Sequence, residues 1–224
     1  VCFECSMAFC MGKKENIHLI GVPRRYAKNI EDVAVAALRV GRAELRFQAY
    51  VGIVIVESQG FLVIPELGIG GEAVGTSGIV VRIDFTRRDI RRIISEELPA
   101  VIYHEFTHLV RERVFGTGST LLDAFVSEGM ACFVEQSLCP KRRIPYVSKI
   151  KNEKRVWSKA VPLLLRRGYD HAGWFFGVKA VPRWAGYRFG YLIVSKFAAV
   201  HRTPLFRLVR MRARDVFVGS GYAA

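Results

Sequence analysis

The chain has 224 residues, of which 51% are hydrophobic and 24% are charged, and its formal net charge is +14 at pH 7. This composition excludes a disordered chain, and no apolar run reaches the roughly 18 residues that a membrane-spanning helix needs. The length suits one domain over residues 1–224, with either a single core or two lobes around a cleft.

The amino-terminal stretch VCFECSMAFCMGKK has neither a basic leader before an apolar stretch nor a small-residue cleavage site, so it does not resemble a secretory signal. We therefore expect a cytoplasmic location. Five cysteines, an odd number, favour free thiols over a disulfide framework. Cys2 and Cys5 have the spacing of zinc ligands and Cys10 lies close by, but no second pair completes a structural zinc set.

The first third of the chain predicts a helix followed by strands. Residues 25–48 show helical spacing of apolar side chains, and we expect that helix to end near Gly41. YVGIVIVES and GFLVIPE predict two strands, with Pro65 at the edge or end of the second. The glycine-rich LGIGGEAVGTSG is expected to be a loop, and SGIVVRIDF alternates as a half-buried strand does.

The rest of the chain is predicted to be mainly helical. Thr86 is expected to cap a helix with Asp89, and Pro99 to mark a kink or the first turn of a second segment. GTGST breaks the chain, and Thr120 then opens the helix LLDAFVSEGMACFVEQSL. A basic connection covers residues 141–160, and RWAGYRFGYLIVSKFAAV is the clearest element of the last third.

The segment HEFTH at residues 104–108 has the spacing of a zinc site. Positions i and i+4 of a helix share one face, so His104 and His108 can point at a common atom. Neutral imidazoles at that spacing suit zinc, and Glu105 would lie beside the metal as a general base. A catalytic zinc usually has three protein ligands and one water, so one ligand is missing from this segment.

Glu128 is the best candidate for the third ligand. It lies on the next predicted helix, on a face with small residues that allow two helices to approach closely. A glutamate on that face would otherwise be a buried charge, which costs several kcal/mol unless it is paired or bound to metal. Asp123 is an alternative third ligand, because some zinc sites use aspartate.

HEFTH with the glutamate of SEGMA resembles the gluzincin clan of zinc metallopeptidases. From ELGIGGEAVGTSGIVVRIDF to RWAGYRFGYLIV, roughly residues 63–200, the chain is similar to a bacterial family of predicted zinc-dependent proteases. The resemblance implies one catalytic Zn²⁺ held by His104, His108 and Glu128, with Glu105 as the general base. It also implies a zincin-like α+β domain, with a sheet-containing lobe over residues 1–115 and a mainly helical lobe over residues 116–224.

One position departs from the gluzincin pattern. Many gluzincins have an aspartate four residues after the third ligand, and this aspartate orients a histidine ligand. Here that position is Cys132. The groups around the ligands must therefore differ, and Asp123 or Glu135 is the candidate replacement.

A hydrolytic zinc site also needs a donor for the developing oxyanion and a surface for the substrate. Tyr187 and Tyr191 lie four apart on one helix face, and either hydroxyl is a candidate donor, with His171 as a weaker one. Both tyrosines could equally be core aromatic residues. The strand at residues 78–85 is either an edge strand that pairs with an extended peptide or plain core structure.

The predicted function is hydrolysis of peptide bonds in a peptide or protein substrate through a zinc-activated water. Endopeptidase and aminopeptidase activity are not distinguished by the sequence. The contrasting hypothesis is a basic regulatory protein that binds nucleic acid or another partner, with a structural or vestigial zinc site. It rests on the charge of +14, which favours anionic partners without identifying one.

Overall fold

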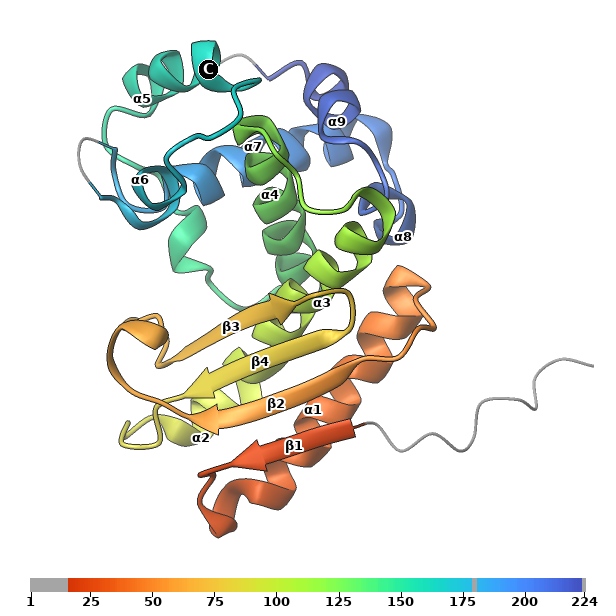
Figure 1. Ribbon diagram of the computed structural model, residues 1–224, viewed down its shortest axis with the longest axis vertical. Coiled ribbons are helices and arrows are strands. Elements are labelled where there is room, and N and C mark those ends of the chain that lie inside the picture. The colour runs from red at the N-terminus through yellow and green to blue at the C-terminus, as the bar shows by residue number, and fades with distance from the viewer. Residues whose placement is uncertain (1–15, 179–180, 223–224) are drawn as a thin grey trace, which may run out of the picture.

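The computed structural model describes residues 16–178 and 181–222, so Cys2, Cys5 and Cys10 lie outside the described residues. The fold is α+β, as predicted, with a mixed sheet in the first half and helices in the second (Figure 1). The sheet and its first helix comprise β1 (Asn16–Ile20), α1 (Arg24–Leu45), β2 (Gly52–Glu57), β3 (Ile69–Val74) and β4 (Gly78–Ile83).

The order of strands in the sheet is β1-β2-β4-β3. The strands β1, β2 and β4 run parallel, while β3 is antiparallel to β4 with Ile69 opposite Ile83 and Val74 opposite Gly78. The predicted burial of Ile79, Val81 and Ile83 on one side of β4 is confirmed. Of the two alternatives for this strand, core structure is confirmed and the edge position is wrong, because β2 and β3 flank β4; the edge strands of the described sheet are β1 and β3.

The edge strand β3 falls where the sequence predicted a loop. The strand predicted at residues 60–66 is instead a 3₁₀ turn at Gly60–Leu62 followed by a single bridge from Ile64 to Ile69. The reason is tertiary packing. A Cβ atom on Gly70 would lie 2.8 Å from the carbonyl oxygen of Leu62, so the glycine permits a close backbone approach.

Two predicted helix boundaries also differ from the structure. The helix α1 continues through Gly41, where a Cβ atom would lie 3.2 Å from the Phe106 ring, and ends before Arg46, which has a φ of 47°. The glycine therefore serves contact between helices and does not end α1. Thr86 does not cap a helix, because its hydroxyl donates to Asp84 at 2.5 Å and the next helix begins only after Asp89.

The remaining helices follow in chain order. Pro99 lies in the first turn of its helix and Thr120 directly precedes the next, as the sequence predicted for the two helix starts. The structure also shows that Thr120 forms a capping box with Asp123. The elements are α2 (Ile90–Arg92), a π-helical segment (Ile93–Glu97), α3 (Leu98–Phe115), α4 (Leu121–Leu138), α5 (Glu153–Ala160), α6 (His171–Phe176), α7 (Ala185–His201), α8 (Leu205–Leu208) and α9 (Ala213–Ser220).

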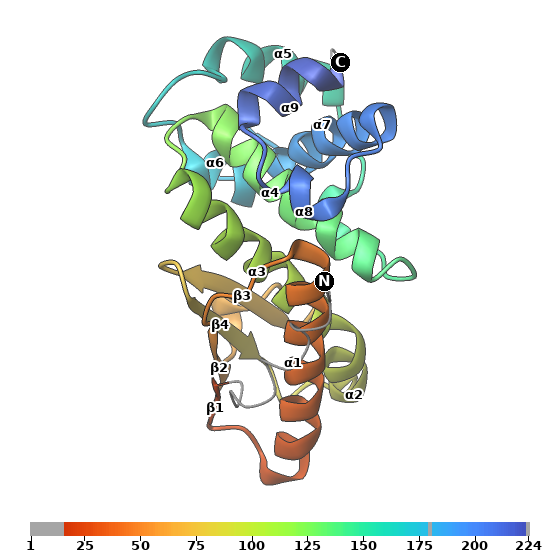
Figure 2. The same ribbon diagram turned by 90° about the vertical axis from the view of Figure 1, so that its right-hand side faces the viewer.

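The described residues form two hydrophobic clusters. One lies between the sheet, α1 and α3, and the other lies among α4, α7 and α9. Figure 2 shows α1 along one face of the sheet, with α3 between the sheet and the upper helices. The sheet cluster also takes in Ile144, Tyr146 and Val209 from the second half of the chain. In the described part of the chain, no helix combines the length and apolar character needed to cross a membrane.

Candidate metal centre

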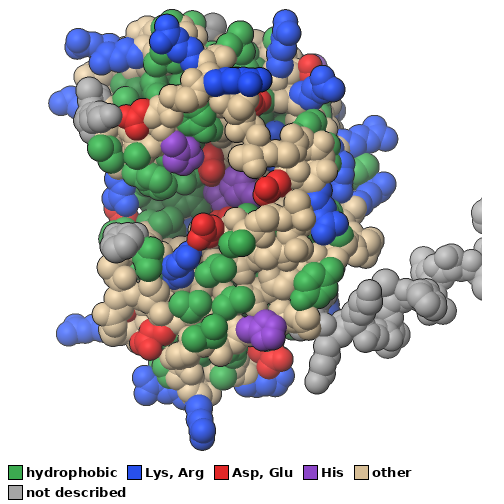
Figure 3. Space-filling view, viewed as in Figure 1, with side chains coloured by type: hydrophobic (Ala, Val, Ile, Leu, Met, Phe, Trp, Pro, Cys, Tyr) green, Lys and Arg blue, Asp and Glu red, His purple; other side chains and the backbone are tan. Residues whose placement is uncertain are grey.

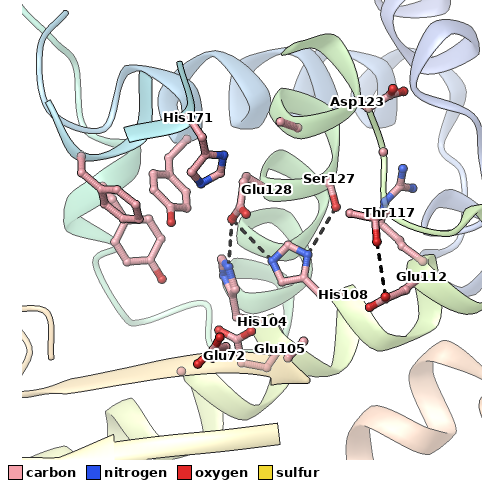
Figure 4. Close-up of a pocket in the computed structure, with 18 of the residues that line it drawn as sticks. Glu72, His104, Glu105, His108, Glu112, Thr117, Asp123, Ser127, Glu128 and His171 are labelled. Atoms are coloured by element: carbon pink, nitrogen blue, oxygen red, sulfur yellow. Dashed lines mark hydrogen bonds and ion pairs between the residues drawn. The ribbon is translucent and has the colours of Figure 1, made fainter. Parts of the chain in front are cut away.

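Two neighbouring helices, α3 and α4, bring three metal-binding side chains together. His104 Nε2 lies 3.2 Å from Glu128 Oε2, and His108 Nε2 lies 3.5 Å from the same oxygen (Figure 4). Ligand atoms of all three residues lie within 4.8 Å of one another. The structure therefore brings together the three residues that the sequence predicted as zinc ligands.

The two histidines approach each other because α3 is regular over this segment. Their ring centroids are 5.0 Å apart, as expected for positions i and i+4 of one helix face. Most of α3 is buried, since it packs against α1, the sheet and α4. His108 Nδ1 lies 3.3 Å from Ser127 Oγ on α4, which helps to fix the orientation of the ring.

Contact between α4 and α7 places Glu128. A Cβ atom on Gly190 would lie 1.9 Å from the carbonyl oxygen of Phe125, and one on Gly129 would lie 2.2 Å from the Gly190 backbone. Only glycine at these positions allows the two backbones to meet. The sequence predicted that the small residues beside Glu128 allow close contact with the helix that carries the histidines. In the structure, Gly129 instead makes its close contact with α7.

The electrostatics of the centre suit a divalent cation. Burial alone would raise the pKa of Glu128, but His108 and His104 outweigh this effect through charge and hydrogen bonds, so the pKa is lowered and the carboxyl group is ionised. Two imidazoles and one carboxylate are a donor set that zinc accepts, with one position left for water or substrate. The residues present therefore fit one zinc ion.

Glu105 lies between the metal centre and the edge strand. Its side chain is 8% exposed, and the backbone N–H of Ala73 on β3 donates to its carboxylate. A Cβ atom on Gly71 would lie 2.7 Å from Glu105 Oε1, so that glycine makes room for the carboxylate. Burial raises the pKa of Glu105 despite the opposing effect of both histidines, which makes it a better proton acceptor when ionised.

Glu135 holds the other side of His104. It is fully buried, its Oε2 lies 3.0 Å from His104 Nδ1, and it accepts from Tyr146 Oη at 2.6 Å and from Arg142. A carboxylate only accepts hydrogen bonds, so in this structure both ring nitrogens of His104 carry protons, with Nδ1 facing Glu135 and Nε2 facing Glu128. Burial alone would lower the pKa of His104, but hydrogen bonds with Cys132, Glu128 and Glu135 raise this pKa well above its ordinary value. A metal at Nε2 would displace that proton, while Glu135 keeps the proton on Nδ1. Of the two residues suggested to replace the gluzincin aspartate, Glu135 therefore contacts the histidine.

Asp123 serves the start of its own helix. Its carboxylate accepts from the backbone N–H groups of Ser119 and Thr120 at 3.2 and 3.1 Å, and from the Thr120 hydroxyl at 2.7 Å. It is not among the groups whose ligand atoms meet in the described part of the chain. All three contacts use Oδ2, and the structure does not bring Asp123 to the two histidines, so the geometry favours Glu128 over Asp123 as the third ligand.

Sequence reasoning missed the residues behind Glu135. Arg142 Nε donates to Glu97 Oε2 at 2.5 Å, and Glu97 is 2% exposed and also accepts from Arg92. Charged side chains thus connect His104 through Glu135 and Arg142 to Glu97, which directly precedes α3. Glu135 was a candidate from the sequence, and it follows Glu128 by about two helical turns on the same face. Arg142 lies in a turn and Tyr146 in a 3₁₀ turn (Pro145–Val147) beyond α4, where no periodic pattern indicated them.

Cys132 lies close to His104 without being a plausible ligand. The thiol is fully buried, and burial raises its pKa to about 12 despite its hydrogen bond with His104. Cys132, His104 and Glu135 also have ligand atoms within 4.8 Å of one another. Arg142 and Tyr146 already bind the Glu135 oxygens, however, so this second group is a hydrogen-bonded cluster.

An open cleft connects the centre to solvent. Figure 3 shows it as a hollow at mid-height, with histidine and acidic side chains at its floor. Tyr187 lines the cleft with its ring centroid 6.4 Å from that of His104, and burial raises the pKa of its hydroxyl, which therefore stays protonated. His171 also lines the cleft and is exposed, whereas Tyr191 packs against Phe133 and does not reach it.

The fold and site define an α+β protein with a partly buried His-His-Glu centre that opens into a cleft beside a strand edge. The chain belongs to the family described as predicted Zn-dependent protease (DUF2268), which matches residues 32–217. The match therefore takes in α1 from residue 32 onward, further towards the amino terminus than residues 63–200 indicated. Comparison with curated proteins and with solved structures gives no match, so the zincin-like fold stays a prediction.

Proposed function

We propose that this protein is a zinc-dependent peptidase that hydrolyses peptide bonds in the cleft that β3 lines together with α4, α6 and α7. The observation that carries the proposal is the convergence of His104, His108 and Glu128 within 4.8 Å, with Glu105 beside them. Membership of a family of predicted zinc-dependent proteases favours this function over the nucleic-acid-binding alternative.

The three ligands would hold one zinc ion, which supplies Lewis acidity that polarises the scissile carbonyl and lowers the pKa of water. Glu105 accepts the proton that the attacking water loses and delivers it to the leaving amine, so that one water and one amide give a carboxylate and an amine. Glu135 keeps the Nδ1 proton on His104 and orients its ring.

Tyr187 would donate a hydrogen bond to the oxyanion that forms on the carbonyl oxygen. Its hydroxyl lines the cleft, and it forms no hydrogen bond with any residue in 16–178 or 181–222. A free donor at this position suits a substrate oxygen. In the described part of the chain no further strand pairs with the outer edge of β3, and residues 70–72 of this edge line the same cleft and would bind the substrate backbone as an added strand.

The test is the variant Glu105→Gln in protein loaded with zinc. Glutamine cannot accept the proton, so we expect loss of peptide hydrolysis, while zinc content stays near that of the wild type because Glu105 is not among the proposed ligands. Glu44→Gln, a matched change at an exposed glutamate of α1, should retain activity. Hydrolysis that survives Glu105→Gln contradicts the mechanism.

A further inference from the structure

The charged side chains that line the cleft differ in whether they have partners. Arg82 pairs with Glu72 at 3.0 Å, and Arg183 pairs with Glu66 at 2.9 Å. Glu105 and Glu128 belong to the metal centre. The remaining charged groups gather at one end of the cleft, beyond His108: Arg111, Glu112, Asp123, Arg212 and Arg214.

Arg111 is a buried cation on the same face of α3 as the two histidines. It is 7% exposed, and its Nη1 donates to Met130 Sδ, Val209 O and Met211 O at 2.8, 3.0 and 3.2 Å. Its Nε is buried without a hydrogen bond. Burial lowers the pKa of Arg111 to about 10, so it stays charged at neutral pH. A buried charge without a counter-ion is costly.

Arg212 and Arg214 supply two more positive charges beside Arg111. They follow the segment whose carbonyl groups Arg111 binds, both are exposed, and both line the cleft where α9 begins. Within residues 16–178 and 181–222, none of the three arginines forms an ion pair with a carboxylate. Like charges that gather without counter-ions repel one another unless an anion binds.

The two acidic residues at this end do not neutralise the arginines. Asp123 already accepts hydrogen bonds at the start of α4, although its charge does raise the pKa of Arg111. Glu112 is half-buried and accepts from the Thr117 hydroxyl at 3.5 Å. In Figure 4 both carboxylates lie on the Thr117 side of His108, away from His171.

We propose that Arg111, Arg212 and Arg214 form a subsite for a carboxylate of the substrate, and this inference rests on the proposed peptidase function. Arg111 is three residues beyond His108, about 4.5 Å further along the axis of α3. A residue of an extended peptide spans about 3.3 Å. The carboxylate therefore belongs one or two residues from the scissile bond, as an Asp or Glu side chain or as a free carboxyl terminus.

Synthetic peptides can distinguish these sources. The first set of peptides is blocked at both ends, and each pair differs by Glu or Gln at one of the two positions before or the two positions after the scissile bond. One further pair differs only in whether the carboxyl terminus is free or amidated. Dissociation constants are measured with the zinc-loaded, full-length Glu105→Gln protein, which binds peptides without cleaving them. At the matching position we expect the carboxylate peptide to bind about ten-fold more tightly than its neutral twin.

The double change Arg212→Ser and Arg214→Ser should bring this ratio near one, because both side chains are exposed and leave the buried packing intact. Arg39→Ser removes one exposed arginine of α1 and should leave the ratio unchanged. An equal affinity for every pair, or a ratio that survives the double change, overturns the subsite.

The two proposals fail in different ways. Wild-type hydrolysis of the neutral peptides without any Glu preference retains the peptidase function and overturns the subsite. Tighter binding of a carboxylate peptide without hydrolysis by the wild type retains the subsite and overturns the peptidase function. If no peptide binds and none is cleaved, both proposals are wrong.

Discussion

Replacing Glu135 by glutamine tests whether the buried charges behind His104 serve the metal centre. Glutamine keeps the shape of the side chain but offers one acceptor and one donor group. One carboxylate oxygen of Glu135 faces His104 Nδ1 at 3.0 Å and Tyr146 Oη at 2.6 Å, and the other faces Arg142. Whichever way the amide turns, its N–H₂ group faces a donor on one side.

The size of the effect follows from this mismatch. Removing one partner of a buried ion pair costs about 3–5 kcal/mol, which is a large part of a typical free energy of unfolding of about 5–15 kcal/mol. If the amide N–H₂ faces His104, the proton moves to Nε2 and that nitrogen no longer binds metal. Loss of a group that orients a metal-bound histidine lowers metal affinity about 10–100-fold.

The assay combines urea unfolding in the presence of a chelator with zinc titration against a competing chelator. Glu153→Gln is the matched control, since it breaks the pair of Glu153 with Arg188 at 2.8 Å, and Glu153 neither lines the cleft nor belongs to the metal-binding group. The control should lose some stability and retain zinc affinity. If Glu135→Gln unfolds at the wild-type urea midpoint and binds zinc as tightly as the wild type, the proposed role of Glu135 is refuted.

Two further changes test other parts of the site. Gly190→Ala should lower both stability and zinc affinity in the same two assays. The Cβ atom of the alanine would lie 1.9 Å from the carbonyl oxygen of Phe125, on the helix that carries Glu128. Overpacking of this kind costs about 1–3 kcal/mol of stability. Unchanged zinc affinity would contradict the link between that helix contact and the centre. Tyr187→Phe should lower kcat about 100-fold with little change in KM or in the urea midpoint, because an oxyanion donor acts only in the transition state. An unchanged kcat would remove Tyr187 from the mechanism.

Local sequence patterns predicted the features that depend on neighbours along the chain. Spacing of four residues placed His104 and His108 on one face, and Thr120 marked the residue before α4. Both follow from helix geometry and from the unpaired N–H groups of a helix start. Glu128 was found because a glutamate among small residues on a helix face calls for a partner or a metal.

The sequence failed where residues distant in the chain decide the structure. The glycines of β3 suggested a loop, and only packing against Leu62 and Glu105 explains why a strand needs them there. Gly41 suggested the end of a helix because glycine has a low helix propensity, whereas in the structure it makes room for the Phe106 ring within α1. Glycine breaks a helix or strand by propensity but also permits close contact, and the sequence alone does not distinguish the two.

By itself, the sequence determined the helix that carries HEFTH, the helix that follows it, and Glu128 on that second helix. These features depend on the helical periodicity of 3.6 residues, which neighbouring residues in the chain reveal. Only the tertiary structure decided that β3 is an edge strand of the described sheet, that Arg142 supports Glu135, and that Arg111 lines the same cleft as Arg212 and Arg214. Arg111 binds the carbonyl groups of residues 209 and 211 across nearly a hundred positions of chain, and such contacts depend on how the helices pack.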